Sequence, residues 1–325
     1  SDELLISKEK IEIASSICKV DLLSDLVGEF PELQGVLGGY FAETQGFEKE
    51  VCIAIKEHYL PHGTDSKIPK KPYSVALSLS DKIDTLTGFF AIDLKPTSSK
   101  DPYALRRLAI GVIKIILENK IKLKLRDFIN YSCQLYINQN VGLDIKNVQK
   151  DVTSFFHDRF KNYMKDNGIR HDIIESATLS YNLDNILKIY TKANILNKLI
   201  SKEVGADVIF SYKRAFNILI NESKNIDTDV SGNVDPGLFK NDFEKILYKK
   251  IYNIRKDFTN VGKEDDYKGL LLNLASVKKE VTDFFENVIV NDNDINIKKN
   301  RLELLKMLCK TFDNYFNFSR IESMS

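Results

Sequence analysis

The sequence predicts an all-α protein, and three observations carry this prediction. Apolar residues recur at the spacing of one helical face in most segments, as in Leu79, Ile83, Leu86 and Phe90. Residues that start or end helices flank these segments, such as Gly168 at the end of one. No stretch shows with any strength the alternation of apolar and polar residues that is typical of a strand. We therefore expect helical domains throughout.

The composition is that of a globular protein and leaves few other classes open. The 325 residues suffice for two or three domains. Lysine and arginine number 47 against 46 aspartates and glutamates, a net charge of +1, so a polyanion would need a local patch of positive charge. The cysteines are far apart and form no CxxC pair, which favours reduced thiols over a disulfide framework or a zinc site. They are Cys18, Cys52, Cys133 and Cys309.

The sequence shows no targeting or membrane segment. No apolar run reaches the roughly 18 residues of a membrane span, and no signal peptide is present. We expect a cytoplasmic protein without a membrane partner. The chain starts with Ser-Asp and no methionine, so we expect a piece of a longer protein.

The first 120 residues carry an unusual glycine pattern. Helices are expected over 7–26 and 48–59. Between them, Gly35, Gly38 and Gly39 lie in a helical pattern, where each costs about 1 kcal/mol relative to alanine. Such a pattern indicates a close approach of helices or a ligand near the backbone.

The stretch 80–116 predicts two helices joined by a loop over 93–100. Asp101 is a good N-cap for the second helix, and Pro102 a good first helical residue. Arg106 falls on an apolar face and so needs a partner or a route to water.

The remaining segments continue the helical pattern, with a short break at 202–206 and a polar loop at 222–237. The expected helices cover 126–137, 144–167, 172–179, 182–200, 208–221, 238–258, 267–287 and 297–318.

The residues alone define no catalytic constellation. The chain has no P-loop, GxGxxG or GxSxG motif. His157-Asp158 and His171-Asp172 resemble the dipeptide of metal-dependent HD phosphohydrolases, but a surface helix explains them better. His58 and His62 are one turn apart with Pro61 between them, so they would not share a helix face.

Carboxylates of the first 100 residues allow two interpretations. Six of them would do acid–base work or bind a cation if they met in one cleft: Asp21, Asp25, Glu29, Glu32, Asp81 and Asp84. The simpler interpretation is that Asp81 and Asp84 cap a helix or pair with Arg106 and Arg107, which we favour as a structural charge cluster.

Three short runs place basic residues beside aromatic or amide side chains. They lie at 212–214, 248–250 and 298–301. Aromatic and guanidinium planes stack on splayed RNA bases, and lysines hold phosphates. On a helical surface most such runs are merely solvated, so both interpretations stay open.

Several long motifs resemble the β subunit of bacterial-type tetrameric glycyl-tRNA synthetases, in the same order and spacing. They are VGEFPELQGVLGGYFA, EHYLP, SDKIDTLTGFF, KDPYALRRLAIGVIKIILE, DRFKNYMKDNGI, YKRAFNIL and FFENVIVNDNDINIKKNRLELL. The resemblance covers essentially the whole chain and would make it the C-terminal half of such a subunit.

The resemblance implies three parts: an HD-like helical domain over 1–120, a helical linker over 121–205, and a DALR-type anticodon-binding domain over 206–325. Active HD sites need histidines that 1–120 lacks, and Asp81 alone matches the downstream aspartate of that superfamily. We expect no bound metal, no hydrolase activity and no catalytic residue in this chain. The resemblance assigns glycine activation, with ATP and magnesium, to the α subunit of an α2β2 enzyme.

The function implied is to bind glycine tRNA at its anticodon and position it for aminoacylation by the α subunit. A glycine anticodon ends in two cytosines, which arginine, lysine and asparagine donors can read. Our candidates are Lys213, Arg214, Asn217, Asn300 and Arg301. Two alternatives stay open: a phosphohydrolase that uses a divalent metal at Asp81, and a purely structural module for subunit assembly.

Overall fold

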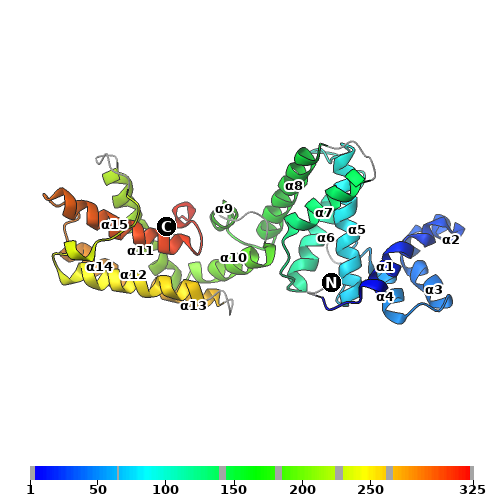
Figure 1. The fold of residues 1–325 in the computed structure, drawn as a ribbon, viewed down its shortest axis with the longest axis horizontal. Helices are drawn as coiled ribbons and strands as arrows, with labels where there is room; N and C mark the ends of the chain where they lie inside the picture. Colours follow the sequence, from blue (N-terminus) through cyan, green and yellow to red (C-terminus); the bar gives the residue numbers. More distant parts are fainter. Residues whose placement is uncertain are drawn as a thin grey trace. The chain divides into compact units, whose positions relative to one another are not determined.

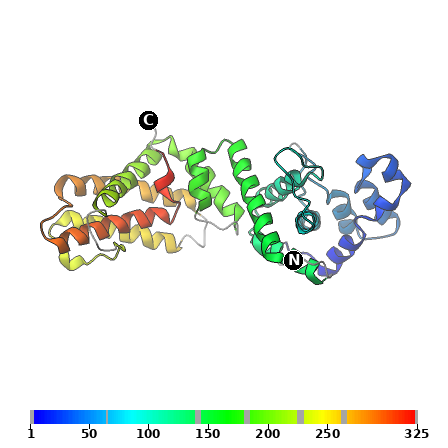
Figure 2. The ribbon, with the colours of Figure 1, turned by 90° about the horizontal axis from the view of Figure 1, so that it is seen from above.

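The computed structural model describes residues 4–63, 66–138, 144–179, 185–223, 230–260 and 266–322. In these ranges the structure contains helices and no strand, which confirms the all-α prediction. Helices pack side by side both with neighbours along the chain and with helices that are more distant in sequence (Figures 1 and 2).

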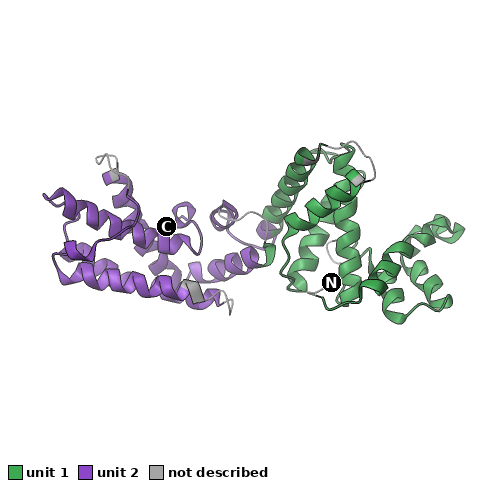
Figure 3. Ribbon diagram, viewed as in Figure 1, with its two compact units in different colours: residues 1–163, 183–187 green, residues 164–182, 188–325 purple. Residues whose placement is uncertain are grey.

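The chain forms two compact units (Figure 3). Unit 1 contains Ser1–Tyr163 and Leu183–Leu187, and unit 2 contains Met164–Asn182 and Lys188–Ser325. Residues of the predicted linker 121–205 lie in both units. The boundaries between the units fall inside two of its helices.

In unit 1 the long helix α5 packs against α1, α4, α6 and α7. Its helices are α1 (Lys8–Ile17), η1 (Val20–Leu23), α2 (Asp25–Glu29), η2 (Pro31–Leu33), α3 (Val36–Thr44), α4 (Lys49–Glu57), α5 (Pro72–Ala91), α6 (Leu105–Glu118), α7 (Leu125–Asn138) and α8 (Ile145–Asp166), of which the last residues belong to unit 2. Small and branched side chains of α1, α3, α4 and α5 fill one core, among them Ala14, Ala42, Ala54 and Ile55.

Unit 2 is a bundle in which α11 packs against α13, α14 and α15, and α12 against α14 and α15. Its helices are α9 (His171–Leu179), α10 (Ile186–Ile200, begun in unit 1), α11 (Glu203–Ser223), η3 (Pro236–Leu238), α12 (Asp242–Asn260), α13 (Tyr267–Ala275), α14 (Lys278–Asn287), α15 (Ile295–Asp313) and η5 (Phe318–Arg320). Aromatic rings of Tyr212, Phe312 and Phe318 meet in its core, with centroids 5.8–5.9 Å apart.

The single helix expected over 7–26 is wrong: the chain breaks it after α1. The buried carboxylate of Asp21 turns inward and accepts hydrogen bonds from the backbone N–H groups of Gly35 (2.6 Å) and Gly38 (3.3 Å). These donors lie at the start of α3, where N–H groups lack helical partners. Ser24 then starts α2 by accepting a hydrogen bond from Val27 N–H.

The glycine pattern serves close packing. Gly35 has φ +79°, a conformation that favours glycine, and a Cβ there would lie 2.8 Å from Tyr59. A Cβ on Gly39 would lie 2.7 Å from the carbonyl oxygen of Cys52 on α4. Of the two explanations for these glycines, the structure supports the close approach of backbones.

The start of the second helix in 80–116 differs from the prediction. The helix begins at Leu105, so Asp101 and Pro102 lie in the turn before it. The Asp101 carboxylate still accepts hydrogen bonds from the backbone N–H groups of Leu105 (2.9 Å) and Arg106 (3.0 Å). The sequence thus identified the capping side chain, but the turn displaces it from the N-cap position.

Three further predictions can be compared directly. The four cysteines are free and buried, as expected. The helix expected over 267–287 is two helices, α13 and α14, which a turn at Ser276 and Val277 separates. Within the described ranges, no helix is both long and apolar enough to cross a membrane. The polar loop predicted over 222–237 lies partly outside the described residues.

Candidate functional site

The N-terminus of α12 is fixed by a reciprocal pair of caps. Asn241 precedes the helix, and its side-chain oxygen accepts a hydrogen bond from Glu244 N–H (3.1 Å). The Glu244 carboxylate accepts hydrogen bonds in return from the backbone N–H groups of Asn241 (3.0 Å) and Lys240 (2.7 Å). This is a capping box, with asparagine in place of serine or threonine. The sequence N-x-x-E at 241–244 therefore determines where α12 begins.

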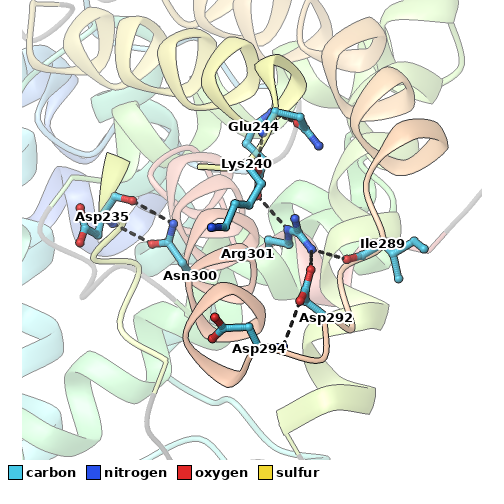
Figure 4. A network of polar contacts seen from close by, with 9 residues as sticks. Asp235, Lys240, Glu244, Ile289, Asp292, Asp294, Asn300 and Arg301 are labelled. Atoms are coloured by element: carbon cyan, nitrogen blue, oxygen red, sulfur yellow. Dashed lines mark hydrogen bonds and ion pairs between the residues drawn. The ribbon is translucent and has the colours of Figure 1, made fainter. Parts of the chain in front are cut away.

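Arg301 on α15 uses the second oxygen of the same carboxylate (Figure 4). Its Nε donates to Glu244 Oε1 at 2.8 Å, and its Nη1 donates to Asp292 Oδ2 (2.6 Å) and to the carbonyl oxygen of Ile289 (2.7 Å). The Arg301 and Glu244 side chains are 6% and 1% exposed. One guanidinium thus connects α15, the start of α12 and the segment between α14 and α15.

Asp292 holds its place in this network as a carboxylate. A hydrogen bond from the backbone N–H of Asp294, together with the Arg301 guanidinium, lowers the pKa of Asp292. A charged acceptor makes stronger hydrogen bonds than a neutral one. The short segment before α15 is therefore tied to the helix that follows it.

Two more polar residues of α15 bind the segment that precedes α12. The Asn300 amide accepts from Asp235 N–H at 2.8 Å and donates to Asp235 C=O at 2.9 Å (Figure 4). The Glu303 carboxylate accepts from the N–H groups of Gly232 and Asn233. Asn300 is 4% and Glu303 is 5% exposed. These residues satisfy backbone groups of an irregular segment that would otherwise lack partners.

Asn300 and Arg301 were predicted to contact tRNA, and their placement argues against that role. Both are buried, Asn300 binds the backbone of Asp235, and Arg301 donates to Glu244, Asp292 and the carbonyl oxygen of Ile289 inside the bundle. The structure therefore assigns these two side chains to the interior of the bundle, where they order the start of α12.

The other predicted candidates lie on α11 and are placed differently from one another. Lys213 is half-buried and donates to the carbonyl oxygen of Ser319 at 3.3 Å. Arg214 is half-buried, with its guanidinium 4.8 Å from the ring centroid of Phe285 on α14. Asn217 is exposed. Of the five candidates, Asn217 alone has an exposed side chain, and its contact with RNA stays a prediction.

A different helix carries the exposed combination of cations and aromatic rings. On α12 six residues share one face, because they are spaced three or four apart along the helix. We call them the α12 basic face: Lys245, Tyr248, Lys249, Tyr252, Arg255 and Lys256. Tyr252 is 57% exposed, and the four cationic side chains of the α12 basic face are exposed as well.

The two tyrosines of this face form a row with Phe239, which lies just before α12. The ring centroids of Phe239 and Tyr248 are 5.6 Å apart, and those of Tyr248 and Tyr252 are 6.4 Å apart. Flat rings in a row offer platforms for successive bases, and flanking cations offer contacts for phosphates. The run Tyr248-Lys249-Lys250 indicated this helix in the sequence, but only the helical phase shows which of its residues are exposed.

The charge cluster predicted in unit 1 does not form as proposed. Asp81 pairs with Lys19, at 2.5 Å between Nζ and Oδ1, and Asp84 accepts hydrogen bonds from Ser132 (3.2 Å) and Tyr136 (3.2–3.3 Å). The pairing of these aspartates with Arg106 and Arg107 is therefore wrong.

The two arginines bind the loops before their own helix. Arg106 lies 3.7 Å from Asp101 and donates to the carbonyl oxygen of Thr97, which supplies the partner that its apolar face requires. Arg107 donates to the carbonyl oxygen of His62 at 3.4 Å. Both contacts stabilise loop segments, since neither acceptor belongs to α5.

The structure does not assemble the histidines into a metal site. His58 is fully buried, with Nδ1 2.7 Å from the carbonyl oxygen of Ile55, whereas His171 is 81% exposed. Asp172 is occupied by Arg170, at 2.7 Å, and by Glu322 N–H. Among the described residues, no group of three histidine, cysteine, aspartate or glutamate side chains is arranged to hold a metal ion.

Comparison with known proteins agrees with this helical organisation. A family model described as "DALR anticodon binding domain" matches residues 208–324, which is most of unit 2. The fold and this match place the chain among proteins with a helical anticodon-binding domain. A second model, described as "Glycyl-tRNA synthetase beta subunit", matches residues 2–179, more than half of the chain. The chain belongs to the glycyl-tRNA synthetase β-subunit family.

Relatives of this family cover nearly the whole chain. The glycine–tRNA ligase β subunit of Rickettsia typhi is 38% identical over 320 residues, which is 97% of this chain and 45% of that protein. Those of Rickettsia canadensis and Rhodospirillum centenum are 39% and 37% identical, and the chain covers 44% of each. The chain therefore spans less than half the length of the curated relatives it matches.

Proposed function

We propose that this chain is the tRNA-binding part of a glycine–tRNA ligase β subunit, and that the α12 basic face contacts the anticodon arm of glycine tRNA. The observation that carries the proposal is the position of this face within the DALR match at 208–324. It combines exposed aromatic rings with cations on a helix whose start is fixed by the Glu244 caps.

The chemistry of the face suits a single-stranded loop. Tyr252 offers a ring on which an unpaired base stacks, and Lys249 and Arg255 lie one turn from it. Their charges neutralise phosphates, and arginine also donates to the acceptor edge of a cytosine. Asn217 on α11 is a second donor for base recognition.

The role in the whole enzyme follows the family. We propose that the chain works in the cytoplasm, in an α2β2 enzyme with the glycyl-tRNA synthetase α subunit. Binding energy gained at the anticodon would hold the acceptor end near the α-subunit site. The chain itself would supply no catalytic group and hold no cofactor, while ATP and magnesium would serve the α subunit.

The test is binding of the 325-residue chain to glycine tRNA, compared with the same tRNA carrying changes at the two anticodon cytosines, at low and moderate salt. We expect a preference for the unchanged tRNA that persists at moderate salt, because base contacts depend less on salt than phosphate contacts. Equal binding of both tRNAs, with an equal loss of affinity on adding salt, would contradict anticodon recognition by this chain.

A further inference from the structure

Unit 1 contains a groove that the tRNA-binding proposal does not use. It has a volume of about 760 Å³ and lies between α1 and η1 on one side and α7 on the other, with α5 as its floor. These four elements are all part of unit 1 (Figure 3). The groove is therefore a feature of a single packed body.

The walls of the groove are apolar and exposed. On α7, Phe128, Tyr131 and Leu135 form a stripe at helical spacing and are 46%, 68% and 39% exposed. On η1, Val20 and Leu23 face the same groove and are 53% and 87% exposed. A helix normally buries such a stripe, and a contiguous exposed apolar surface of this kind marks an interaction site.

The floor of the groove carries uncompensated negative charge. Lys19 and Asp81 pair with each other, at 2.5 Å, and so cancel. Asp84 accepts hydrogen bonds from the hydroxyls of Ser132 and Tyr136, and no lysine or arginine of the described ranges forms an ion pair with it. Glu12 at the rim pairs with Lys8 at 3.6 Å, and the side chains of both residues are exposed, so water screens this pair. An occupant must therefore bring positive charge as well as apolar side chains.

We propose that this groove binds an amphipathic α-helix of a protein partner, one whose apolar face carries a flanking lysine or arginine. Its apolar side chains pack between the α7 stripe and η1, and its cation lies above Asp84. Helix-in-groove recognition uses apolar anchors along one face in this way. This inference goes beyond the proposed function, because none of these residues belongs to the anticodon-binding bundle.

The same charges disfavour two other occupants. A nucleic acid would bring phosphates to Asp84 and Glu12, which repel them. A second copy of this chain that paired groove to groove would bring identical carboxylates together, because a two-fold contact joins the same surface of both copies. A basic helix from another protein has the charge that the groove lacks.

The experiment uses the whole 325-residue chain and two synthetic peptides as probes. Both peptides are amphipathic helices of about 18 residues, long enough to be helical, with identical leucine faces; one carries lysines on its polar face and the other glutamates. Binding is measured by fluorescence anisotropy at moderate salt. We expect the lysine peptide to bind at least about tenfold more tightly than the glutamate peptide.

Two variants connect this binding to the groove. F128S/Y131S removes the apolar stripe and should weaken the lysine peptide about tenfold or more, since burial of each ring contributes to affinity. D84N should reduce the preference for lysine over glutamate about threefold. The matched control is I289S/I295S, which removes two residues of unit 2 that are 78% and 69% exposed and should leave binding unchanged.

Four results would overturn the proposal. The first would be equal binding of the two peptides, and the second would be binding of the lysine peptide to F128S/Y131S as tightly as to the unaltered chain. The third would be a dimer of the chain in sedimentation that F128S/Y131S abolishes, which would make a second copy the occupant. The fourth would be binding of a labelled single-stranded RNA that weakens in F128S/Y131S. Circular dichroism of each variant verifies folding, which the exposure of Phe128 and Tyr131 favours.

Discussion

Helices α12 and α15 both carry polar residues among apolar ones, yet they use them in opposite ways. On α15, Asn300, Arg301 and Glu303 point into the bundle and bind backbone groups and a carboxylate. On α12, Lys249 and Tyr252 point to solvent. Composition alone does not distinguish these cases. The helical phase does, because it decides whether a charged side chain is a structural tie or a contact for a ligand.

The largest expected effect is the loss of Arg301. In R301M the Glu244 carboxylate, 1% exposed, would lose its cation, and Asp292 would lose a donor. Leaving a buried charge unpaired costs about 3–5 kcal/mol of unfolding free energy. Urea unfolding of the full chain measures this change.

A double substitution separates the unpaired charge from lost packing. R301M/E244M removes both charges, so it should be less destabilised than the sum of the single variants. If R301M unfolds at the same urea midpoint as the unaltered chain, the buried Arg301–Glu244 ion pair does not stabilise the bundle, and this difference between α15 and α12 is wrong.

Lys192 on α10 sharpens the comparison through pH. Lys192 is 2% exposed, and its Nζ lies 4.6–4.7 Å from the ring centroids of Tyr315 and Phe316. Burial lowers the pKa of Lys192 from 10.5 to about 7, and the nearby charge of Lys188 lowers it to a smaller extent. Between about pH 7 and the unfolded value, the unfolded chain binds a proton that the folded chain does not. The unfolding free energy therefore rises with pH in this window.

The K192M variant isolates this contribution, since methionine has a similar length and no charge. The unaltered chain should gain stability relative to K192M by at most about 1.4 kcal/mol per pH unit above about pH 7. Below that pH both states carry the proton, and the difference should be flat. Unfolding curves recorded from pH 6 to 9.5 measure it, and parallel pH profiles would exclude a buried lysine with a lowered pKa.

A smaller effect on affinity, without one on stability, is expected at Tyr252. Removal of a stacking ring in Y252A should weaken tRNA binding by about 1–3 kcal/mol. Because the side chain is 57% exposed, the unfolding midpoint should stay within experimental error. Filter binding and thermal unfolding of the same preparation give both numbers. Y103A, at 45% exposure in unit 1, is the matched control and should bind tRNA normally.

The smallest effect is expected for the ion pair at the start of α12. Lys245 and Asp242 are 3.0 Å apart, with side chains 60% and 83% exposed. Water screens such a pair, so K245Q should change the unfolding free energy by about 0.5 kcal/mol or less. Urea unfolding beside R301M compares an exposed and a buried pair directly. Equal destabilisation by K245Q and R301M would show that burial does not make the Arg301–Glu244 pair contribute more to stability than the exposed Lys245–Asp242 pair.

Much of the fold followed from local patterns. The long amphipathic helices α8 and α15 lie near their expected positions, because apolar periodicity reports the buried face of a helix, whereas α5 begins at Pro72, eight residues before the expected start. The break after α1 was not, since it depends on Asp21 reaching the start of α3, residues that are distant in sequence. The division of residues 121–205 between the two units likewise depends on tertiary packing, which composition does not report.

The candidate site was harder to predict than the fold. Asn300 and Arg301 looked like RNA ligands because they belong to a run of polar residues, and the sequence could not show that Glu244 and Asp235 meet them from elsewhere in the chain. A search for N-x-x-E capping boxes would have placed Glu244 at a helix start. The second oxygen of the Glu244 carboxylate then needs a donor, and this need points to a nearby buried cation such as Arg301.

We propose that α12, and not α15, contacts tRNA, and one measurement tests this proposal most directly. The variant K249Q/R255Q is titrated with glycine tRNA at several salt concentrations, beside R301K, which keeps the charge of α15. We predict that K249Q/R255Q loses affinity and that its slope of log affinity against log salt is shallower by about 1.4, the value for two phosphate contacts on a single strand. Folded R301K should keep the slope of the unaltered chain. An unchanged slope in K249Q/R255Q, with a shallower one in R301K, would contradict the account.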